Sequence, residues 1–295
     1  MKTFPELTAS VIITTKNRKE ELRDALRSAV TQTVQPEVIV IDDGSSDGTA
    51  ALVSSEFPSV LLHRFEKSKG LIVQRNNGAQ LATGDVIFSI DDDAVFSTPL
   101  IIEQTLRGFT EPKIGAVAIP YVDINKDKQV HQGAPHHDQV WITHTFIGTA
   151  HAVRRDVFLQ LNGYRESLVH QGEESDYCLR LLAAGYVVRL GTADPIHHFE
   201  SPKRDFRRMD FYGCRNAILF AWQNVPMPDL PFYLIATSWN CLRWTFDLKR
   251  LPTRLAGIIA GYGDCLTTQR APVGRPVFQL WRRLKKAGAS PFPPA

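Results

Sequence analysis

The first hundred residues alternate between short apolar runs and longer segments with helical signals. The apolar runs, rich in β-branched residues, cover residues 9–15, 37–42, 60–65 and 85–90. Because these runs are almost continuously apolar, they predict strands buried on both faces of a sheet. Helical signals lie between them at 47–57, with Asp47 as N-cap, at 70–82, and in an apolar stripe of Leu22, Ala25, Leu26, Ala29 and Val30. This order predicts an α/β fold with a mostly parallel sheet flanked by helices.

Polar residues follow three of these four predicted strands. They occupy residues 14–18 after the first strand, 42–49 after the second and 91–93 after the fourth. In an open parallel sheet, ligands bind outside the carboxyl ends of the strands, so these runs are expected to share one edge. Arg75, in the middle of a predicted helix, either reaches the same edge or is an ordinary surface arginine.

The run Asp91-Asp92-Asp93 directly follows an apolar strand. Side chains alternate along a strand, so Asp91 and Asp93 are expected on one side and Asp92 on the other. Two carboxylates on one side provide the hard oxygen ligands that Mg²⁺ or Mn²⁺ accept, particularly beside phosphates. The alternative is an acidic turn at the end of a strand.

Taken together, residues 10–18, 40–49, 75–78 and 91–93 resemble, in order and spacing, the motifs of a family 2 glycosyltransferase. The resemblance implies a Rossmann-like GT-A fold, a nucleotide-sugar donor and a DxD motif that binds Mg²⁺ or Mn²⁺. It places Asp43 near the base, with Asp42 beside it, and Asp93 and Asp91 at the metal. The nucleotide-binding residues it implies are Thr14, Thr15, Asn17, Arg18, Asp42, Asp43, Arg75, Asp91 and Asp92.

A second acidic cluster begins after Gly172, where the pattern becomes helical. A helix N-terminus favours ionised carboxylates, as a general base requires, although simple helix-capping acids would give the same pattern. The resembled family usually reads Gly-Glu-Asp-x-Asp here, with the second acid as base, which corresponds to Glu174. Because this residue is longer by one methylene, Glu173 stays an alternative. The candidate catalytic residues are Glu174, Glu173 and Asp176.

The histidines are harder to interpret from the sequence. His198 follows a short predicted strand and a proline, and is expected either to complete the metal site or to be an ordinary loop histidine. His131, His136 and His137 are expected at the surface. Gly148 lies in a stretch that resembles the acceptor side of the family.

The charge is unevenly distributed along the chain. Residues 1–200 hold 19 Lys and Arg against 26 Asp and Glu, whereas residues 201–295 hold 15 against 5. Aromatic residues interleaved with these basic ones indicate a helical segment that contacts an anionic membrane surface, or one that packs on the domain with its charges in solvent. Nucleic acid is not expected as a partner, because no binding motif accompanies the charge.

Location is predicted from what the sequence lacks. Its four cysteines show no CxxC pair, its N-terminus carries no signal-peptide pattern, and no window reaches 18 apolar residues. We therefore expect reduced cysteines and a cytoplasmic protein, peripheral on the inner face of the membrane if the basic segment binds lipid.

These observations predict a catalytic domain over residues 1–200, divided into a nucleotide-binding half (1–95) and an acceptor half (96–200), and a basic, aromatic-rich helical extension over 201–295. The resemblance implies an inverting, metal-dependent glycosyltransferase that transfers sugar to a carbohydrate or lipid-linked acceptor in bacterial-type surface glycan or glycolipid synthesis. One alternative is a sugar-1-phosphate nucleotidyltransferase, although residues 14–18 lack the expected glycine-rich loop. The other is a non-catalytic nucleotide-sugar-binding protein.

Overall fold

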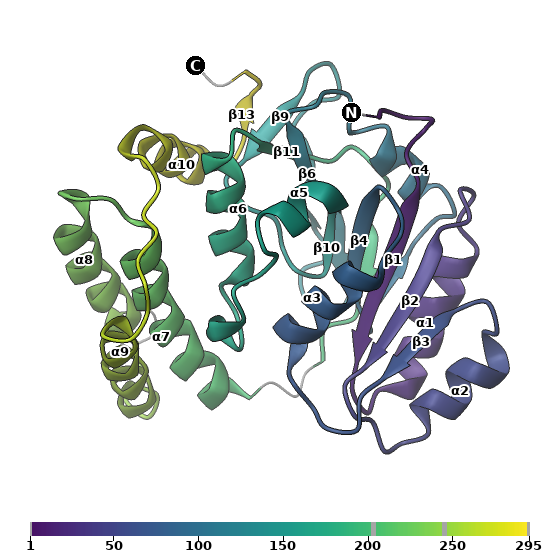
Figure 1. The fold of residues 1–295 in the computed structure, drawn as a ribbon, viewed down its shortest axis with the longest axis horizontal. Coiled ribbons are helices and arrows are strands. Elements are labelled where there is room, and N and C mark those ends of the chain that lie inside the picture. The colour runs from purple at the N-terminus through teal and green to yellow at the C-terminus, as the bar shows by residue number, and fades with distance from the viewer. Residues whose placement is uncertain (1, 202–204, 244–246, 294–295) are drawn as a thin grey trace.

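The computed structural model describes residues 2–201, 205–243 and 247–293 (Figure 1). The strands are β1 (Ala9–Thr15), β2 (Glu37–Asp42), β3 (Leu61–Arg64), β4 (Val86–Asp91), β5 (Ala94–Phe96), β6 (Ile114–Ala118), β7 (Tyr121–Asp123), β8 (Val130–His131), β9 (Trp141–Thr143), β10 (Ala150–Arg154), β11 (Val187–Leu190), β12 (Ile196–His198) and β13 (Ser290–Pro291). The helices are α1 (Lys19–Val30), α2 (Thr49–Glu56), α3 (Leu71–Leu81), α4 (Ile101–Leu106), α5 (Arg155–Gln160), α6 (Glu173–Ala183), α7 (Phe206–Asn224), α8 (Asp229–Arg243), α9 (Leu251–Cys265) and α10 (Arg275–Ala287).

The main sheet has the strand order β13-β9-β11-β6-β10-β4-β1-β2-β3 within the described residues. The strands predicted from the first hundred residues are all present, and β3, β2, β1 and β4 run parallel. In the register, Thr14 lies beside Ile41 on one side and Asp91 on the other. The carboxyl ends of β1, β2 and β4 therefore meet at one edge, as the polar runs predicted.

Both faces of this sheet are buried against helices (Figure 1). Along β1, Val11 and Ile13 belong to the core that includes α1, α2 and α4, whereas Ile12 belongs to the core that includes α3, α5 and α6. Alternate side chains thus enter opposite cores, which explains why the strand sequences are continuously apolar. The α/β fold class is confirmed.

The N-cap predicted for α2 was displaced by one residue. Gly48, with φ +90°, occupies that position, and the Asp47 carboxylate accepts hydrogen bonds from the Thr49 backbone N–H (3.1 Å) and hydroxyl (2.6 Å). The left-handed backbone at Gly48 suits glycine, which has no Cβ to clash.

A smaller sheet has the strand order β5-β12-β7-β8, and its first strand, β5, directly follows the three aspartates in the chain. Within it, β12 pairs with β5 and β7, and His198 lies opposite Ala94 and Asp123. This pairing brings Asp123 and His198, which follow Asp93 by 30 and 105 positions in the sequence, to the end of β4.

The C-terminal helices pack against one another and against the main body. Helix α7 packs along α9, α10 contacts α6 and β9, and β13 pairs with β9 at the end of the main sheet. Several apolar side chains nevertheless stay exposed, among them Phe232, Ile235 and Trp239 on α8 and Ile259 on α9. Lys203 and Arg204, counted in the basic extension, lie outside the described residues, and the domain boundary at residue 200 stays a prediction.

All four cysteines are free and buried. Among the helices that the structure describes, none combines the length and apolar character needed to cross a membrane.

Candidate active site

The loops after β1 and β2 hold each other in place. The Asn17 backbone N–H donates to the Ser45 hydroxyl (2.9 Å), and the Asn17 side-chain oxygen accepts from the Ser46 N–H (2.7 Å). Asn17 has φ 55°, a left-handed conformation that asparagine tolerates better than most residues. Asn17 was predicted to bind nucleotide, and the structure places it at the predicted edge as a brace between two loops.

The two aspartates that end β2 have different surroundings. Asp43 accepts hydrogen bonds from Ser68, Lys69, Gly70 and Gln74, and although burial raises its pKa, these donors outweigh burial and lower it. Asp42 is fully buried; its Oδ1 accepts from the Ser45 N–H (2.8 Å), whereas its Oδ2 has no hydrogen-bond partner among the described residues. Asp42 therefore has one carboxylate oxygen that accepts no hydrogen bond within the described part of the chain, whereas both oxygens of Asp43 accept hydrogen bonds.

The three aspartates after β4 divide as the strand alternation predicted. Ligand atoms of Asp91, Asp93 and His198 lie within 4.8 Å of one another. Asp92 points elsewhere: it accepts from the Thr15 hydroxyl (2.8 Å) and pairs with Arg18 (3.0 Å). Arg18 also binds Asp93 (2.9 Å), so it ties the two sides together. Burial raises the pKa of Asp92 to about 7.

His198 reaches the aspartates through the smaller sheet. Its Nε2 is 3.4 Å from Asp93 Oδ1, and its Nδ1 is 3.3 Å from Asp123 Oδ2. Burial alone would lower the pKa of His198, but the hydrogen bond and charge of Asp93 outweigh it and raise the pKa. Asp123 was missed in the sequence, where the available signal was an acid ending a short apolar run.

These side chains fit a divalent cation. Two carboxylates suit Mg²⁺ or Mn²⁺, and an imidazole nitrogen adds a ligand that transition metals prefer. The carboxylate of Asp123 behind the imidazole is the usual partner that orients a metal-binding histidine. The expected ligands Asp91, Asp93 and His198 are therefore close enough to act together.

Arg75 joins the aspartates to the second acidic cluster. Its side chain is 5% exposed and pairs with Asp91 (2.7 Å), Glu173 (3.2 Å) and Glu174 (3.9 Å). The alternative of an ordinary surface arginine is therefore wrong. One guanidinium is the shared counter-ion of three carboxylates contributed by β4 and α6.

Glu173 and Glu174 begin α6, after Gly172 with its φ of +89°. The Glu173 side chain is 3% exposed and its Oε2 has no hydrogen-bond partner among the described residues, whereas the Glu174 side chain is 21% exposed. Burial, together with the neighbouring Glu173, raises the pKa of Glu174 to about 8. Gly148 gives Glu174 its room, because a Cβ there would lie 2.5 Å from Glu174 Oε1.

Asp176 does not belong to this cluster. It is fully buried and is held by Arg165 (2.6 Å), Arg180 (2.9 Å) and Asn224 (2.8 Å). A buried carboxylate enclosed by two guanidinium groups and an amide links α6 to α7 through ion pairs and a hydrogen bond. The structure thus places Asp176 on Arg165 and Arg180, apart from Glu173 and Glu174, and the catalytic role expected from the sequence stays a prediction.

Asn216, on α7, holds the loop that precedes α6. Its side-chain amide donates to the carbonyl groups of Leu168 (2.7 Å), His170 (2.7 Å) and Gln171 (2.8 Å). No sequence pattern indicated this contact, since a polar residue within a helix is normally exposed. The C-terminal extension thus helps to place the start of α6.

The sequence of the chain also matches a known protein family. The model of glycosyl transferase family 2 matches residues 10–161, more than half of the chain. The chain belongs to glycosyl transferase family 2. The matched segment contains the three aspartates and Arg75, whereas α6 and the C-terminal helices lie beyond it.

Two curated relatives illustrate the range of the family. A glucosyl-dolichyl phosphate glucuronosyltransferase of Haloferax volcanii is 25% identical over 201 residues, covering 58% of this chain and 62% of the relative. An O-antigen chain rhamnosyltransferase of Salmonella typhimurium is 26% identical over 218 residues, covering 68% and 69%. The chain thus spans about three fifths of the length of the first of these relatives.

Solved structures show the same fold. A mannosyltransferase from Pyrobaculum calidifontis, in complex with GDP-Man and Mn²⁺, aligns with a TM-score of 0.58 at 19% identity, covering 94% of this chain and 79% of that one. TarS of S. aureus in complex with UDP-GlcNAc gives 0.61 at 16% identity, covering 93% and 84%. The GT-A fold expected from the resemblance is confirmed.

Proposed function

We propose that this protein transfers a sugar from a nucleotide diphosphate sugar to an acceptor hydroxyl, with inversion and with the help of a divalent cation. The observation that carries this proposal is the pair of acidic clusters joined by Arg75 at the carboxyl ends of the strands. One cluster suits a cation and a diphosphate, and the other suits a proton acceptor. An in-line displacement needs these two functions on opposite sides of the reacting carbon.

On the donor side, the loops after β1 and β2 are proposed to receive the nucleoside. The Oδ2 of Asp42 accepts no hydrogen bond from the described residues and lies 3.6 Å from Arg64 Nε, which favours Asp42 as the acceptor for a base N–H, while Asp43 shapes the turn. Thr14, Thr15 and Arg18 would border the ribose and diphosphate. A cation held by Asp91, Asp93 and His198 would stabilise the negative charge that develops on the leaving diphosphate.

On the acceptor side, Glu174 is the proposed general base. It is more accessible than Glu173, and its pKa near 8 makes it a stronger base than an ordinary glutamate. Glu173 is proposed to fix Arg75, and through Arg75 the position of Asp91. We therefore propose Glu174 rather than Glu173 as the base.

The relatives' names support a role in surface glycan or glycolipid synthesis, because they include a glucosyl-dolichyl phosphate glucuronosyltransferase and an O-antigen chain rhamnosyltransferase. A location on the inner face of the membrane is proposed from the exposed apolar residues of α8 and α9. A nucleotidyltransferase would not need a base at Glu174, and a non-catalytic binder would bind donor without turnover.

The test is a panel of nucleotide sugars with Mn²⁺ or Mg²⁺, scored by donor binding and by slow donor hydrolysis. Glu174→Gln should lower turnover by about a hundredfold or more while donor affinity is kept. Glu111→Gln, at an exposed glutamate outside the site, is the matched control. Wild-type turnover in Glu174→Gln would show that Glu174 is not the base, and donor binding without any turnover would favour the non-catalytic alternative.

A further inference from the structure

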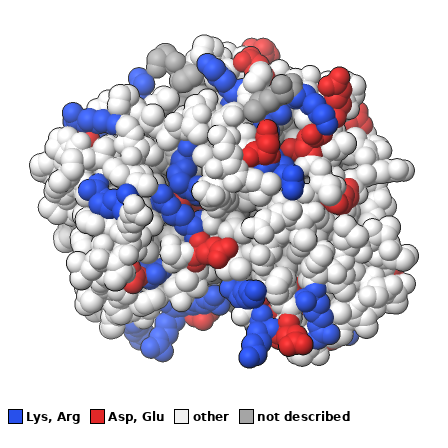
Figure 2. Space-filling model, in the orientation of Figure 1, with Lys and Arg blue, Asp and Glu red and all other residues white. Residues whose placement is uncertain are grey.

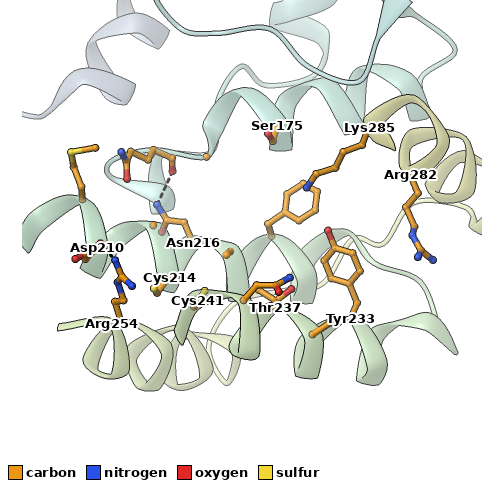
Figure 3. Close-up of a pocket in the computed structure, with 18 of the residues that line it drawn as sticks. Ser175, Asp210, Cys214, Asn216, Tyr233, Thr237, Cys241, Arg254, Arg282 and Lys285 are labelled. Carbon is orange, nitrogen blue, oxygen red and sulfur yellow. Dashed lines mark hydrogen bonds and ion pairs between the residues drawn. The ribbon is translucent and has the colours of Figure 1, made fainter. Parts of the chain in front are cut away.

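A cavity of about 770 Å³ lies between the start of α6 and helices α7, α8 and α10 (Figure 3). Its size falls within the roughly 300–1,000 Å³ typical of small-molecule sites. Phe220, Tyr233 and Trp281 contribute aromatic surface to its wall, and Ser175 contributes a hydroxyl from α6. Nothing in the donor site described above uses this cavity.

The charges that line the cavity are almost all positive. Its only acid, Asp210, pairs with Arg250 (2.6 Å) and Arg254 (3.2 Å). Arg282 and Lys285, from α10, have no carboxylate partner among the described residues, and Lys285 Nζ lies 5.0 Å from the centroid of the Trp281 ring. Figure 3 shows both side chains extending from α10 beside Tyr233. The cavity therefore combines an apolar wall with basic groups not neutralised by the protein.

We propose that this cavity binds a lipid phosphate, with the phosphate at Arg282 and Lys285 and the hydrocarbon chain against the aromatic wall. Unpaired basic groups favour an anion, and the apolar wall favours an anion that also carries a hydrocarbon chain. The proposal rests on the proposed function and narrows its acceptor to a sugar carried on a lipid phosphate.

The exposed surface next to the cavity fits a ligand that is partly embedded in a membrane. On α8, Phe232, Ile235 and Trp239 are 76%, 69% and 58% exposed, and their spacing places them on one face of the helix. Figure 2 shows that the side of the molecule formed by α8 and α9 carries mainly uncharged atoms, with Lys and Arg prominent toward the rest of the protein. A chain leaving the cavity would meet this apolar surface.

The other end of the cavity lies beside the start of α6, the helix that carries the proposed base. Gln171, Gly172 and Ser175 line it, and Gly172 directly precedes Glu173 and Glu174. A group attached to a phosphate in the cavity would therefore be held near the start of α6, where its hydroxyl has to meet Glu174. Asn216 also lines the cavity while it holds this loop.

The test measures calorimetric binding of octyl phosphate to the full chain, below the concentration at which the ligand forms micelles. Octanol and inorganic phosphate serve as the chain and anion alone. We expect saturable binding of octyl phosphate, about tenfold or more tighter than either half. Arg282→Ala/Lys285→Ala should weaken it by about tenfold or more, whereas Arg283→Ala, on the same helix but not lining the cavity, should bind as the wild type does.

A second variant tests the cavity by volume. Ala236→Trp places a large side chain at an exposed position of the lining and should block octyl phosphate, whereas Ile235→Trp, one residue away and outside the lining, should not. Equal binding by the Arg282/Lys285 variant and the wild type, or equal loss in Arg283→Ala, would overturn the site. So would octanol binding as tightly as octyl phosphate.

Donor binding with Mn²⁺ or Mg²⁺ is measured on the wild type in parallel. If no nucleotide sugar binds while octyl phosphate still depends on Arg282 and Lys285, the proposed function fails and the lipid-phosphate site stands. If donor binds but octyl phosphate does not, the site is overturned and the proposed function stands.

Discussion

The two acidic clusters of this chain share Arg75 but are balanced in opposite ways. At the end of β4, Asp93 has Arg18 and His198 beside it, and these groups lower its pKa despite burial. At the start of α6, Glu173 and Glu174 have only Arg75 between them, and burial raises the pKa of both. The surroundings therefore favour the ionised form of Asp93 and the protonated form of Glu173 and Glu174.

One arginine, Arg75, thus contributes to two sites with different electrostatic requirements. Arg75 is closer to Asp91 (2.7 Å) than to Glu174 (3.9 Å), so it supports the cation site strongly and the proposed base weakly. A base held tightly by a guanidinium would have a low pKa and would be a poor proton acceptor. Substitutions in either cluster can test this difference.

The largest effect is expected at the cation site. Asp93→Ala removes a proposed cation ligand and one of the acidic partners of both Arg18 and His198, so turnover should fall by about a hundred- to a thousandfold. The measurement is donor affinity by calorimetry with and without Mn²⁺. Asp138→Ala, at an exposed aspartate outside the site, is the control. Donor affinity that stays equally dependent on Mn²⁺ would remove Asp93 from the cation site.

The next effect comes from removing the shared charge. Arg75→Gln leaves three carboxylates without a counter-ion, and breaking a buried ion pair typically costs about 3–5 kcal/mol of stability. We expect a lower free energy of unfolding, measured by urea denaturation at pH 9, where Glu174 is ionised, and a smaller loss at pH 6, where its raised pKa of about 8 keeps it protonated. A loss that is the same at both pH values would show that Arg75 does not balance α6.

How much of this site was readable from the sequence depends on the distance between its parts along the chain. Asp91 ends β4, and Asp92 and Asp93 directly follow it, so their placement on alternate sides could be predicted from neighbouring positions in the sequence. The same holds for the strand ends that gather Thr15 and Asp42 at one edge.

The remaining parts depended on packing between distant segments. Asp43 accepts hydrogen bonds from the turn at residues 68–70, and Asp176 is bound by a helix nearly fifty residues away. Asp123 joins the site only because β7 pairs with β12. No local pattern encodes such contacts, since each partner looks like an ordinary polar residue.

A smaller effect is expected from pH. Because burial raises the pKa of Glu174 to about 8, kcat/KM should rise with pH by about tenfold per unit below that value and then level off. The same shift affects stability: the protonated form is favoured by folding, so this contribution is present below the ordinary pKa of 4.5 and is lost as the pH rises through about 8. Glu174→Gln should therefore raise Tm at pH 9 more than at pH 5. A pH profile with its limb near 4.5 would contradict the raised pKa.

The smallest effect is expected from Asn216 on α7, which holds the loop that precedes the proposed base. Asn216→Asp keeps the size of the side chain but removes the amide that donates to three carbonyl groups of the loop before α6. The loop should shift while the cation site stays unchanged, so kcat should fall by about tenfold with little change in donor KM. Asn77→Asp, where the amide donates to Gln74 on the same helix, controls for a lost side-chain hydrogen bond. Should Asn216→Asp change donor KM and kcat together, α7 would support the whole fold rather than the position of Glu174.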